Sequence, residues 1–384
     1  MKISILTPDL SHNCVGRAYL LTKVLQRHYE VEIIGPAFGS GIWKPIADDK
    51  SIRYRYIRVS GKLRPYWQLR DIIKSISGNV IYASKPLVAS YGIGLLEKFL
   101  NGKPIVLDID DWEIGFIKAY RKLSFRYLVS SIVCLYSRSS YWNNLLGERF
   151  SYFASDITVS NSFLRKKFGG TIVWHGRNTD VFNPMKFDKN IIREKYEIEK
   201  DKKVIIFVGT PRPHKGIDDL IEAMTLVKEP SVILVVVGID YSDPYCLDVI
   251  HTAEKKLDKN RFIAFGLQPF RKIPEFLAMA DVVVIPQKKN FATVGQVPAK
   301  VFDAMAMEKA IISTNVSDIP EILYRCGWIV EPERPKELAQ AIQYILDNPR
   351  KAQEMSRKAR ERCIEKYSWE AIEKILVKVF GKYE

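Results

Sequence analysis

The sequence predicts an α/β protein of two Rossmann-like domains, each built on a parallel β-sheet. Its 384 residues exceed what one ordinary hydrophobic core holds. Short runs of Val and Ile lack polar alternation, which is typical of strands buried on both faces by helices. These runs alternate with helical patterns, and the rhythm restarts after about residue 180.

The first domain is predicted to span residues 1–178. Its first strand is "KISIL", followed by a helix around Val15–His28. The later strands are expected at "VEIIG", "YRYIRV", "NVIYAS", "PIVLDI" and "DITVS".

The boundary between the two domains is expected in "WHGRNTDVFNP", Trp174 to Pro184, which is rich in Gly, Asn, Asp and Pro. The second domain, residues 179–367, would contain the strands "KVIIFVG", "SVILVVVG", "RFIAFG", "DVVVIP" and "AIIST". A final helix over 368–384 is predicted to return to the first domain.

The net charge of +15 and the pI of about 9.4 favour an anionic partner, namely nucleic acid, an anionic membrane surface or phosphorylated substrates. Alternatively, the positive charge reflects lysines scattered over the surface of a basic globular protein. The five cysteines lie far apart without a CxxC pair, which excludes a zinc cluster or a disulfide framework and suits the cytoplasm. The first apolar run is too short for a signal peptide, and no run approaches the roughly 18–20 residues that span a bilayer.

The segment Phe116 to Leu146 departs from this rhythm. It mixes aromatic and aliphatic residues with five Lys and Arg and contains no acidic residue. This composition suits a helix or helical hairpin in the interface of a membrane, on its inner face. An ordinary domain helix with solvated arginines is the alternative.

Basic residues follow the first strand of the second domain, in "VGTPRPHKGIDDLIEAM". Gly209 to Gly216 lead into a helix whose first N–H groups attract anions. Arg212 adds a bidentate donor and Lys215 a point charge, so the stretch predicts a diphosphate site. It is not a Walker loop, and a plain basic turn before a helix is the alternative.

A second anion-binding loop is predicted in "ATVGQVPAKVFDAMAMEKAIIST". The loop residues Gly295, Gln296 and Val297 precede Pro298, which suits a first helical position, and Lys300 follows. Asp303, one turn inside, can accept hydrogen bonds from ribose hydroxyls. Alternatively, Asp303 is an N-terminal acid favoured by the helix dipole alone.

Two further positions are candidates for ligand contact. Gly266 and Leu267 end a strand, where free backbone groups could read a base edge. Gly16, after the first strand, would let the backbone approach a ligand, although an ordinary turn also explains it.

Several motifs in order resemble glycosyltransferases of the GT-B fold and the GT4 type. They are "VGTPRPHKGIDDLIEAM", "IVWHGRNTDVFNP", "FGLQPFRKIPEFLAMADVVVIPQ", "PAKVFDAMAMEKAIISTNVSDIPEIL" and "EKYSWEAI". The resemblance covers nearly the whole chain and implies a retaining, metal-independent enzyme without a cofactor. Such an enzyme takes a nucleotide-sugar on its second domain, and the two domains face each other across a cleft.

The resemblance assigns roles in the second domain. Arg212 and Lys215 would bind the donor diphosphate and stabilise it as a leaving group. Asp303 stands at the second acidic position of the family's E-x7-E pattern. Gly295 stands where the first Glu would be, so recognition of the sugar must depend on other groups, such as the backbone amides of Gly295 and Gln296.

In the first domain the family's glycine beside the phosphates corresponds to Gly16. The "DIDDW" segment places Asp110 at the usual His position and Asp111 in a "D.W" variant. Either aspartate could orient an acceptor hydroxyl or accept its proton. A metal-binding D-x-D pair of Asp108 and Asp110, or a strand-end cap, is the alternative.

The sequence therefore predicts transfer of a sugar to a hydroxyl of a glycan or lipid-linked acceptor. UDP is the commonest donor nucleotide of the family and GDP the next. A GT-B-like nucleotide-binding protein with weakened catalysis, or a sugar phosphorylase or epimerase of the same architecture, is the alternative. No motif for binding nucleic acid is present.

Overall fold

The computed structural model describes residues 1–59, 64–258 and 260–384. The chain divides into two compact units. Unit 1 comprises Met1–Gly176, Val294–Val297 and Glu370–Glu384, and unit 2 comprises Arg177–Thr293 and Pro298–Trp369.

Unit 1 contains a seven-stranded parallel sheet in the order β3-β2-β1-β4-β5-β6-β7. The strands are β1 (Lys2–Leu6), β2 (Glu30–Ala37), β3 (Arg53–Arg58), β4 (Val80–Ser84), β5 (Ile105–Ile109), β6 (Asp156–Val159) and β7 (Thr171–Ile172). Residues of β1, β4 and β5 are almost entirely buried, as their apolar runs predict.

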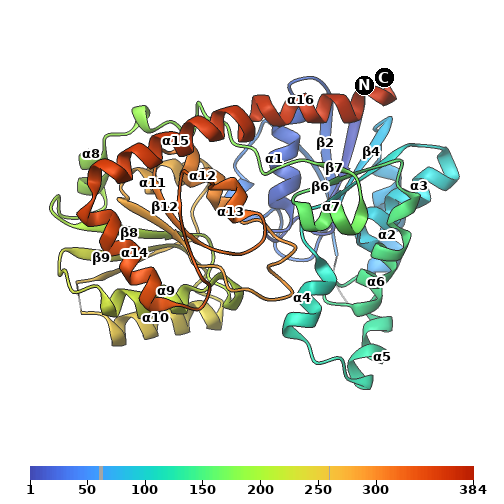
Figure 1. Ribbon diagram of the computed structural model, residues 1–384. Helices are drawn as coiled ribbons and strands as arrows, with labels where there is room; N and C mark the ends of the chain where they lie inside the picture. Colours follow the sequence, from blue (N-terminus) through green and yellow to red (C-terminus); the bar gives the residue numbers. More distant parts are fainter. Residues whose placement is uncertain (60–63, 259) are drawn as a thin grey trace. The chain divides into compact units, whose positions relative to one another are not determined.

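The helices of unit 1 cover both faces of this sheet (Figure 1). They are α1 (Val15–Leu25), α2 (Arg64–Ser75), α3 (Ile93–Asn101), α4 (Glu113–Tyr120), α5 (Phe125–Val133), α6 (Tyr141–Phe150), α7 (Ser162–Phe168) and α16 (Trp369–Phe380). A single π-turn, η2 (Val88–Gly92), precedes α3. On one face, residues of α2, α3 and α7 pack on β4 and β5 in a continuous apolar core.

Residues 370–384 group with unit 1, although they end the chain. Phe380 of α16 packs edge-on against Tyr82 of β4, with ring centroids 5.1 Å apart. Arg27 pairs with Glu370 at 2.7 Å, and Lys382 with Asp156 at 2.9 Å. Buried aromatic contact thus positions α16, since exposed ion pairs add little.

Unit 2 contains a six-stranded parallel sheet in the order β10-β9-β8-β11-β12-β13. The strands are β8 (Lys203–Val208), β9 (Val232–Ile239), β10 (Phe262–Gly266), β11 (Val282–Ile285), β12 (Ala310–Thr314) and β13 (Trp328–Val330). Every residue of β9, β11 and β12 is buried.

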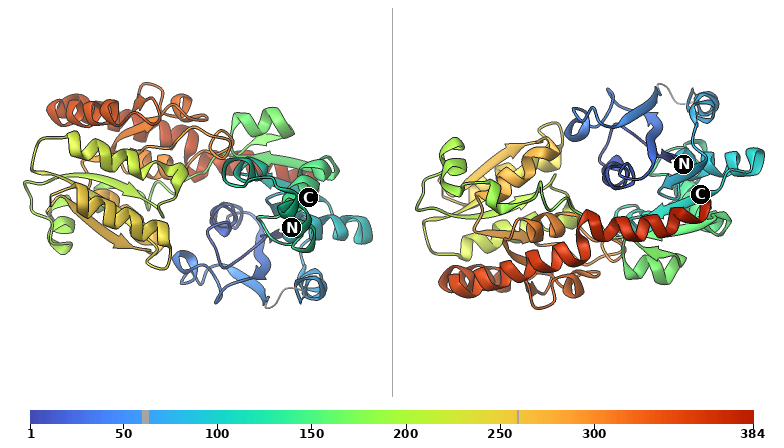
Figure 2. Two further views of the ribbon diagram at one scale, coloured as in Figure 1. Left: turned by 90° about the horizontal axis from the view of Figure 1, so that it is seen from below. Right: turned by 90° about the horizontal axis from the view of Figure 1, so that it is seen from above.

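Helices also cover both faces of the unit 2 sheet. They are α8 (Lys189–Lys195), α9 (Ile217–Leu226), α10 (Pro244–Lys256), α11 (Ile273–Ala278), α12 (Lys300–Ala306), α13 (Ile319–Ile322), α14 (Pro335–Asp347) and α15 (Pro349–Tyr367). Figure 1 shows α9, α10 and α14 on one face and α8, α11, α12 and α15 on the other. The view from below in Figure 2 shows α9 and α10, yellow-green and gold, side by side.

Both sheets are doubly wound, and this positions the candidate sites. The strand order reverses between β1 and β4 in unit 1 and between β8 and β11 in unit 2. Ligands of such sheets bind outside the carboxyl ends of the strands at this switch point. The prediction of two parallel-sheet α/β domains is confirmed.

Candidate functional site

In unit 2 the loop after β8 has a backbone that requires glycine. Gly209 has φ 112° and Gly216 φ 65°, both in the left-handed region. A Cβ on Gly216 would overlap the carbonyl oxygen of Pro286, which follows β11. The loop therefore presses against the end of the neighbouring strand at the switch point, and α9 begins there.

Lys300 points its amine at this loop from the start of α12. Its Nζ is buried and has no hydrogen-bond partner among the residues that the structure describes. It lies 3.7 Å from the ring centroid of Phe207 and would lie 3.3 Å from a Cβ on Gly209. Burial, and then the charge of Lys215, hold the pKa of the Lys300 amine well below its ordinary value. An anion at this loop would supply the missing partner for Lys300.

The two predicted phosphate ligands differ in their surroundings. The Nζ of Lys215 donates to the carbonyl oxygen of Thr210 at 2.7 Å, inside the loop. Arg212 forms an ion pair with Asp243, which caps α10, and its side chain is 38% exposed. Lys215 therefore lies with Lys300 at the loop, and Arg212 leans toward the adjacent helix.

Asp303 lies in the first turn of α12, as expected, but the predicted helical start at Pro298 is wrong. The N-cap of α12 is Ala299, so Pro298 precedes the helix. Asp303 is 6% exposed and pairs with Arg177, which also donates to the carbonyl oxygen of Ala299 at 3.1 Å. Sequence reasoning missed Arg177, because its partner is 126 residues away.

The expected strand is β10; Gly266 is its last residue, and Leu267 follows it. The carbonyl oxygen of Gly266 accepts from the side chain of Gln268 at 3.3 Å. A Cβ on Gly266 would lie 3.1 Å from the ring of Tyr241, which is 58% exposed. Tyr241 therefore presents an aromatic surface beside the position predicted to read a base, and no sequence pattern indicated it.

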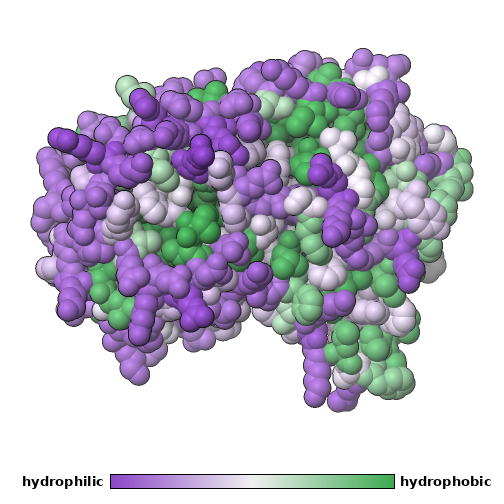
Figure 3. Space-filling model, viewed as in Figure 1, coloured by the Kyte–Doolittle hydropathy of each residue, from purple (hydrophilic) through white to green (hydrophobic). Residues whose placement is uncertain are grey.

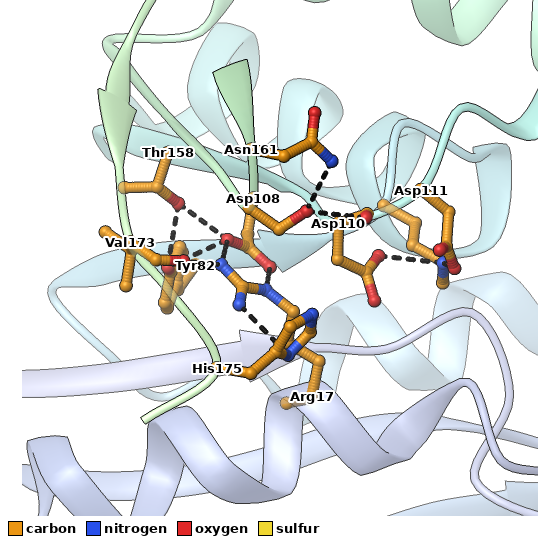
Figure 4. A network of polar contacts seen from close by, with 12 residues as sticks. Arg17, Tyr82, Asp108, Asp110, Asp111, Thr158, Asn161, Val173 and His175 are labelled. Carbon is orange, nitrogen blue, oxygen red and sulfur yellow. Dashed lines mark hydrogen bonds and ion pairs between the residues drawn. The ribbon is translucent and has the colours of Figure 1, made fainter. Parts of the chain in front are cut away.

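In unit 1 a buried network connects α1 with the sheet (Figure 4). Gly16 lies at the start of α1, and the next residue, Arg17, donates to both carboxylate oxygens of Asp108 at 2.7 and 2.8 Å. Asp108 also accepts from Thr158 at 2.8 Å and from Tyr82 at 3.3 Å. The two aspartates of the D-x-D pattern thus have different partners. Asp108 pairs with Arg17 and holds α1 on the sheet, whereas Asp110 pairs with Lys85.

Asp110 and Asp111 follow β5 and surround the amine of Lys85, which follows β4. The Nζ of Lys85 lies 2.7 Å from Asp110, 2.6 Å from Asp111 and 2.7 Å from Glu113. Arg138 lies 3.8 Å from Glu113. Sequence reasoning found the two aspartates but missed Lys85. Its position directly after a buried strand could have indicated it as a site residue.

The predicted loop of Gly295, Gln296 and Val297 belongs to unit 1. The side-chain amide of Gln296 donates to Asp111 Oδ1 at 2.7 Å. A Cβ on Gly295 would lie 2.5 Å from the Cβ of Trp112, so the backbone packs directly on this side chain. Val297 is 1% exposed. The loop therefore meets the turn that carries the two candidate catalytic aspartates.

Comparison with known families identifies the segment that carries the unit 2 loop. Residues 188–362 match the family described as "Glycosyl transferases group 1". The resemblance to glycosyltransferases that the motifs predict is thereby confirmed for this segment.

The individual relatives of the chain are distant. It is 27% identical to the alpha-maltose-1-phosphate synthase of Mycolicibacterium smegmatis over 55% of this chain and 56% of that protein. It is 23% identical to the capsular polysaccharide biosynthesis glycosyltransferase CapM of Staphylococcus aureus over 79% and 80%. The chain spans about half the length of the first of these curated relatives.

Solved structures support the same fold. The Anabaena protein HepE, in its complex with UDP-glucose, is 16% identical to this chain. The alignment covers 100% of each chain with a TM-score of 0.79. The sucrose-phosphate synthase of Thermosynechococcus elongatus is 16% identical, with a TM-score of 0.76 over 100% of this chain and 98% of that one. The predicted GT-B architecture is thus confirmed.

Proposed function

We propose that the chain is a hexosyltransferase that moves a sugar from a nucleoside-diphosphate sugar to a hydroxyl of a glycan or lipid-linked acceptor. The observation that carries this proposal is the buried amine of Lys300 beside Lys215 and the glycine loop after β8, since this amine has no hydrogen-bond partner among the described residues. Two amines and a helix start at a switch point match the charge of a diphosphate. UDP is the first candidate nucleotide, since HepE has the same fold and its structure contains UDP-glucose, and GDP is the second.

The loop would act by stabilising the leaving group. As the bond between the sugar and the diphosphate lengthens, negative charge grows on the phosphate oxygens. Lys215 and Lys300 are already in place for this charge, with Arg212 at the edge of the loop. We propose that these cations replace a metal ion, that no cofactor takes part, and that the anomeric configuration is retained, as the family resemblance implies.

A panel of UDP, GDP, ADP and their sugars tests donor binding by thermal shift. A ligand that binds only the folded state raises the melting temperature. Lys215→Ala is expected to lose roughly 10²–10³ in transfer rate while staying folded. The matched control is Lys228→Ala, an exposed lysine of the same unit. Full transfer by Lys215→Ala would refute the assignment, and complete loss in EDTA, restored by Mg²⁺, would refute metal independence.

A nucleotide-binding protein with weakened catalysis is the second candidate. Gly295 favours it, because no side chain at this position can contact a donor sugar. Donor hydrolysis discriminates between the two. A transferase slowly passes its sugar to water, whereas a binding protein returns the nucleotide-sugar unchanged.

We further propose that α5 and its flanking loops contact an anionic membrane surface, on the cytoplasmic side. The exposed fraction is 83% for Phe125, 58% for Ile132 and 61% for Val133. Figure 3 shows hydrophobic surface gathered over α5, beside hydrophilic residues. The basic residues nearby are Lys118, Arg121, Lys122 and Arg126. No helix in the described ranges is long and apolar enough to cross a bilayer.

Vesicle flotation tests this contact. Wild-type protein should float with anionic vesicles at low salt and not with neutral ones, because each basic residue near the surface contributes about 1 kcal/mol. Phe125→Ser with Ile132→Ser should abolish flotation. The control is Met185→Ser with Ile191→Ser, since both residues are exposed in unit 2. Equal flotation by the two double variants would overturn the proposal.

A further inference from the structure

Tyr241 is an exposed aromatic residue at the carboxyl edge of the unit 2 sheet. It lies two positions after the end of β9 and is 58% exposed. A turn fixes its place, because the amide of Asp243 donates to the carbonyl oxygen of Asp240 at 2.9 Å. One carboxylate oxygen of Asp240 also accepts from the amide and the hydroxyl of Ser242, at 3.0 and 2.6 Å. The tyrosine is therefore carried by an ordered, hydrogen-bonded backbone.

The ring of Tyr241 packs on the end of the neighbouring strand, β10. Its Cε2 and Cδ2 atoms lie 3.1 and 3.8 Å from where a Cβ on Gly266 would be. Glycine at the last position of β10 thus gives the ring room to lie against the backbone. This support covers one part of the ring, and the exposed fraction of Tyr241 leaves the rest accessible to a ligand.

The segment that carries Tyr241 also adjoins the loop after β8. A Cβ on Gly238, the last residue but one of β9, would lie 2.8 Å from the carbonyl carbon of Gly209 and 3.0 Å from the amide nitrogen of Thr210. Arg212 of the same loop pairs with Asp243 at the end of the turn. Backbone packing and an ion pair therefore join the turn to the loop that carries the candidate diphosphate site.

The order of the strands determines how far apart these positions lie. β10, β9 and β8 are consecutive in the sheet. Neighbouring strands lie about 4.8 Å apart, so the end of β10 is about 10 Å from the loop after β8. In a nucleoside diphosphate a ribose separates the base from the diphosphate, which suits a separation of this order.

We propose that Tyr241 is the surface on which the nucleobase of the donor stacks, while the diphosphate lies beside Lys215 and Lys300. This inference rests on the proposed transferase function and assigns its nucleotide a further contact within unit 2. Every base has a π-face, so stacking on Tyr241 adds affinity without selecting the base. Selection then depends on groups that meet the edge of the base, such as the backbone at Leu267.

The test compares a ligand that has a base with one that has none. Wild type, Tyr241→Ala and Tyr241→Phe are titrated calorimetrically with UDP, GDP and inorganic pyrophosphate. Tyr241→Ala should bind the nucleotide that wild type binds about 5- to 100-fold more weakly, because base–aromatic stacking is lost. It should bind pyrophosphate as tightly as wild type does, since the cations of the loop remain. Tyr241→Phe keeps the ring and should bind both ligands as wild type does.

The matched control is Tyr324→Ala, since Tyr324 is also 58% exposed and lies between α13 and β13 of the same unit. This variant should bind both ligands normally, and melting temperatures show whether each variant is folded. Unchanged nucleotide affinity in Tyr241→Ala would overturn the inference. An equal loss of pyrophosphate affinity would overturn it too, because the tyrosine would then only support the loop, and so would a loss of nucleotide affinity in Tyr241→Phe. A wild type that binds no nucleotide would instead refute the proposed function.

Discussion

Replacing Lys300 by Met should make the ligand-free protein more stable and donor binding weaker. Met keeps the length and the methylene contacts of the side chain but removes the buried amine. That amine has no hydrogen-bond partner in the described part of the chain. A buried, unsatisfied donor costs about 1–3 kcal/mol, and the amine regains about 0.5–2 kcal/mol from the Phe207 ring when charged. The net gain in stability of the variant is therefore expected to be about 1 kcal/mol, or about 2–4 °C in melting temperature.

The loss of donor affinity should be larger. A hydrogen bond between the amine and a phosphate oxygen contributes about 1.5–3 kcal/mol, which corresponds to a decrease in affinity of about 10- to 100-fold. Isothermal titration of the nucleoside diphosphate measures this change. In wild type, binding should also take up protons, because the phosphate favours the charged form of an amine whose pKa is lowered in the empty site. Titrations in buffers of different ionisation enthalpy count these protons.

The pH dependence of stability has a definite sign. Unfolded Lys300 holds its proton up to its ordinary pKa of 10.5, whereas the folded residue loses it at lower pH. Between these two values the unfolded state binds more protons, so the free energy of unfolding of the ligand-free protein rises with pH. This part of the rise should be absent in Lys300→Met. A variant that is less stable than wild type and binds the diphosphate equally well would refute the reasoning.

Three further substitutions test the framework of the two sites by urea unfolding. Gly216→Ala should lower the free energy of unfolding by about 1–3 kcal/mol or more, since φ is 65°, whereas Gly381→Ala, in open space, should not. Arg17→Met leaves the buried Asp108 carboxylate unpaired and should cost about 3–5 kcal/mol; a change below 1 kcal/mol would contradict the anchoring role. Burial, and then nearby Lys189, lower the pKa of Lys309 to about 8, so Lys309→Met should flatten the rise of stability with pH above 8.

The fold was predictable from the sequence because its signal is local. Buried parallel strands appear as uninterrupted Val and Ile runs, and the strands β8, β9 and β11 lie where those runs do. Lys215 and Asp110 were also found, because Asp110 directly follows such a run and Lys215 lies in the loop after one. The carboxyl ends of parallel strands gather at one edge, so proximity to a strand end is already information about the site.

Partners distant in the sequence could not be predicted. Lys85 is separated from its carboxylates by at least 25 positions, and Arg177 lies 126 positions from Asp303. Arg212 was predicted to face a phosphate from its position alone. Its ion pair with Asp243 depends on how α10 lies beside the loop. The position of α10 cannot be derived from the spacing of residues in the sequence.

The glycine at position 295 and the acidic cluster of unit 1 have a common physical origin. Trp112 lies 2.5 Å from where a Cβ of residue 295 would be, so a glutamate at this position would displace the tryptophan. The residue before Trp112 is Asp111, which accepts a hydrogen bond from the residue after Gly295. The turn of Asp111 and Trp112 therefore excludes a glutamate from position 295. The same turn places the Asp111 carboxylate beside the loop, 2.6 Å from the Lys85 amine. The absence of a glutamate at position 295 therefore follows from the packing of this turn.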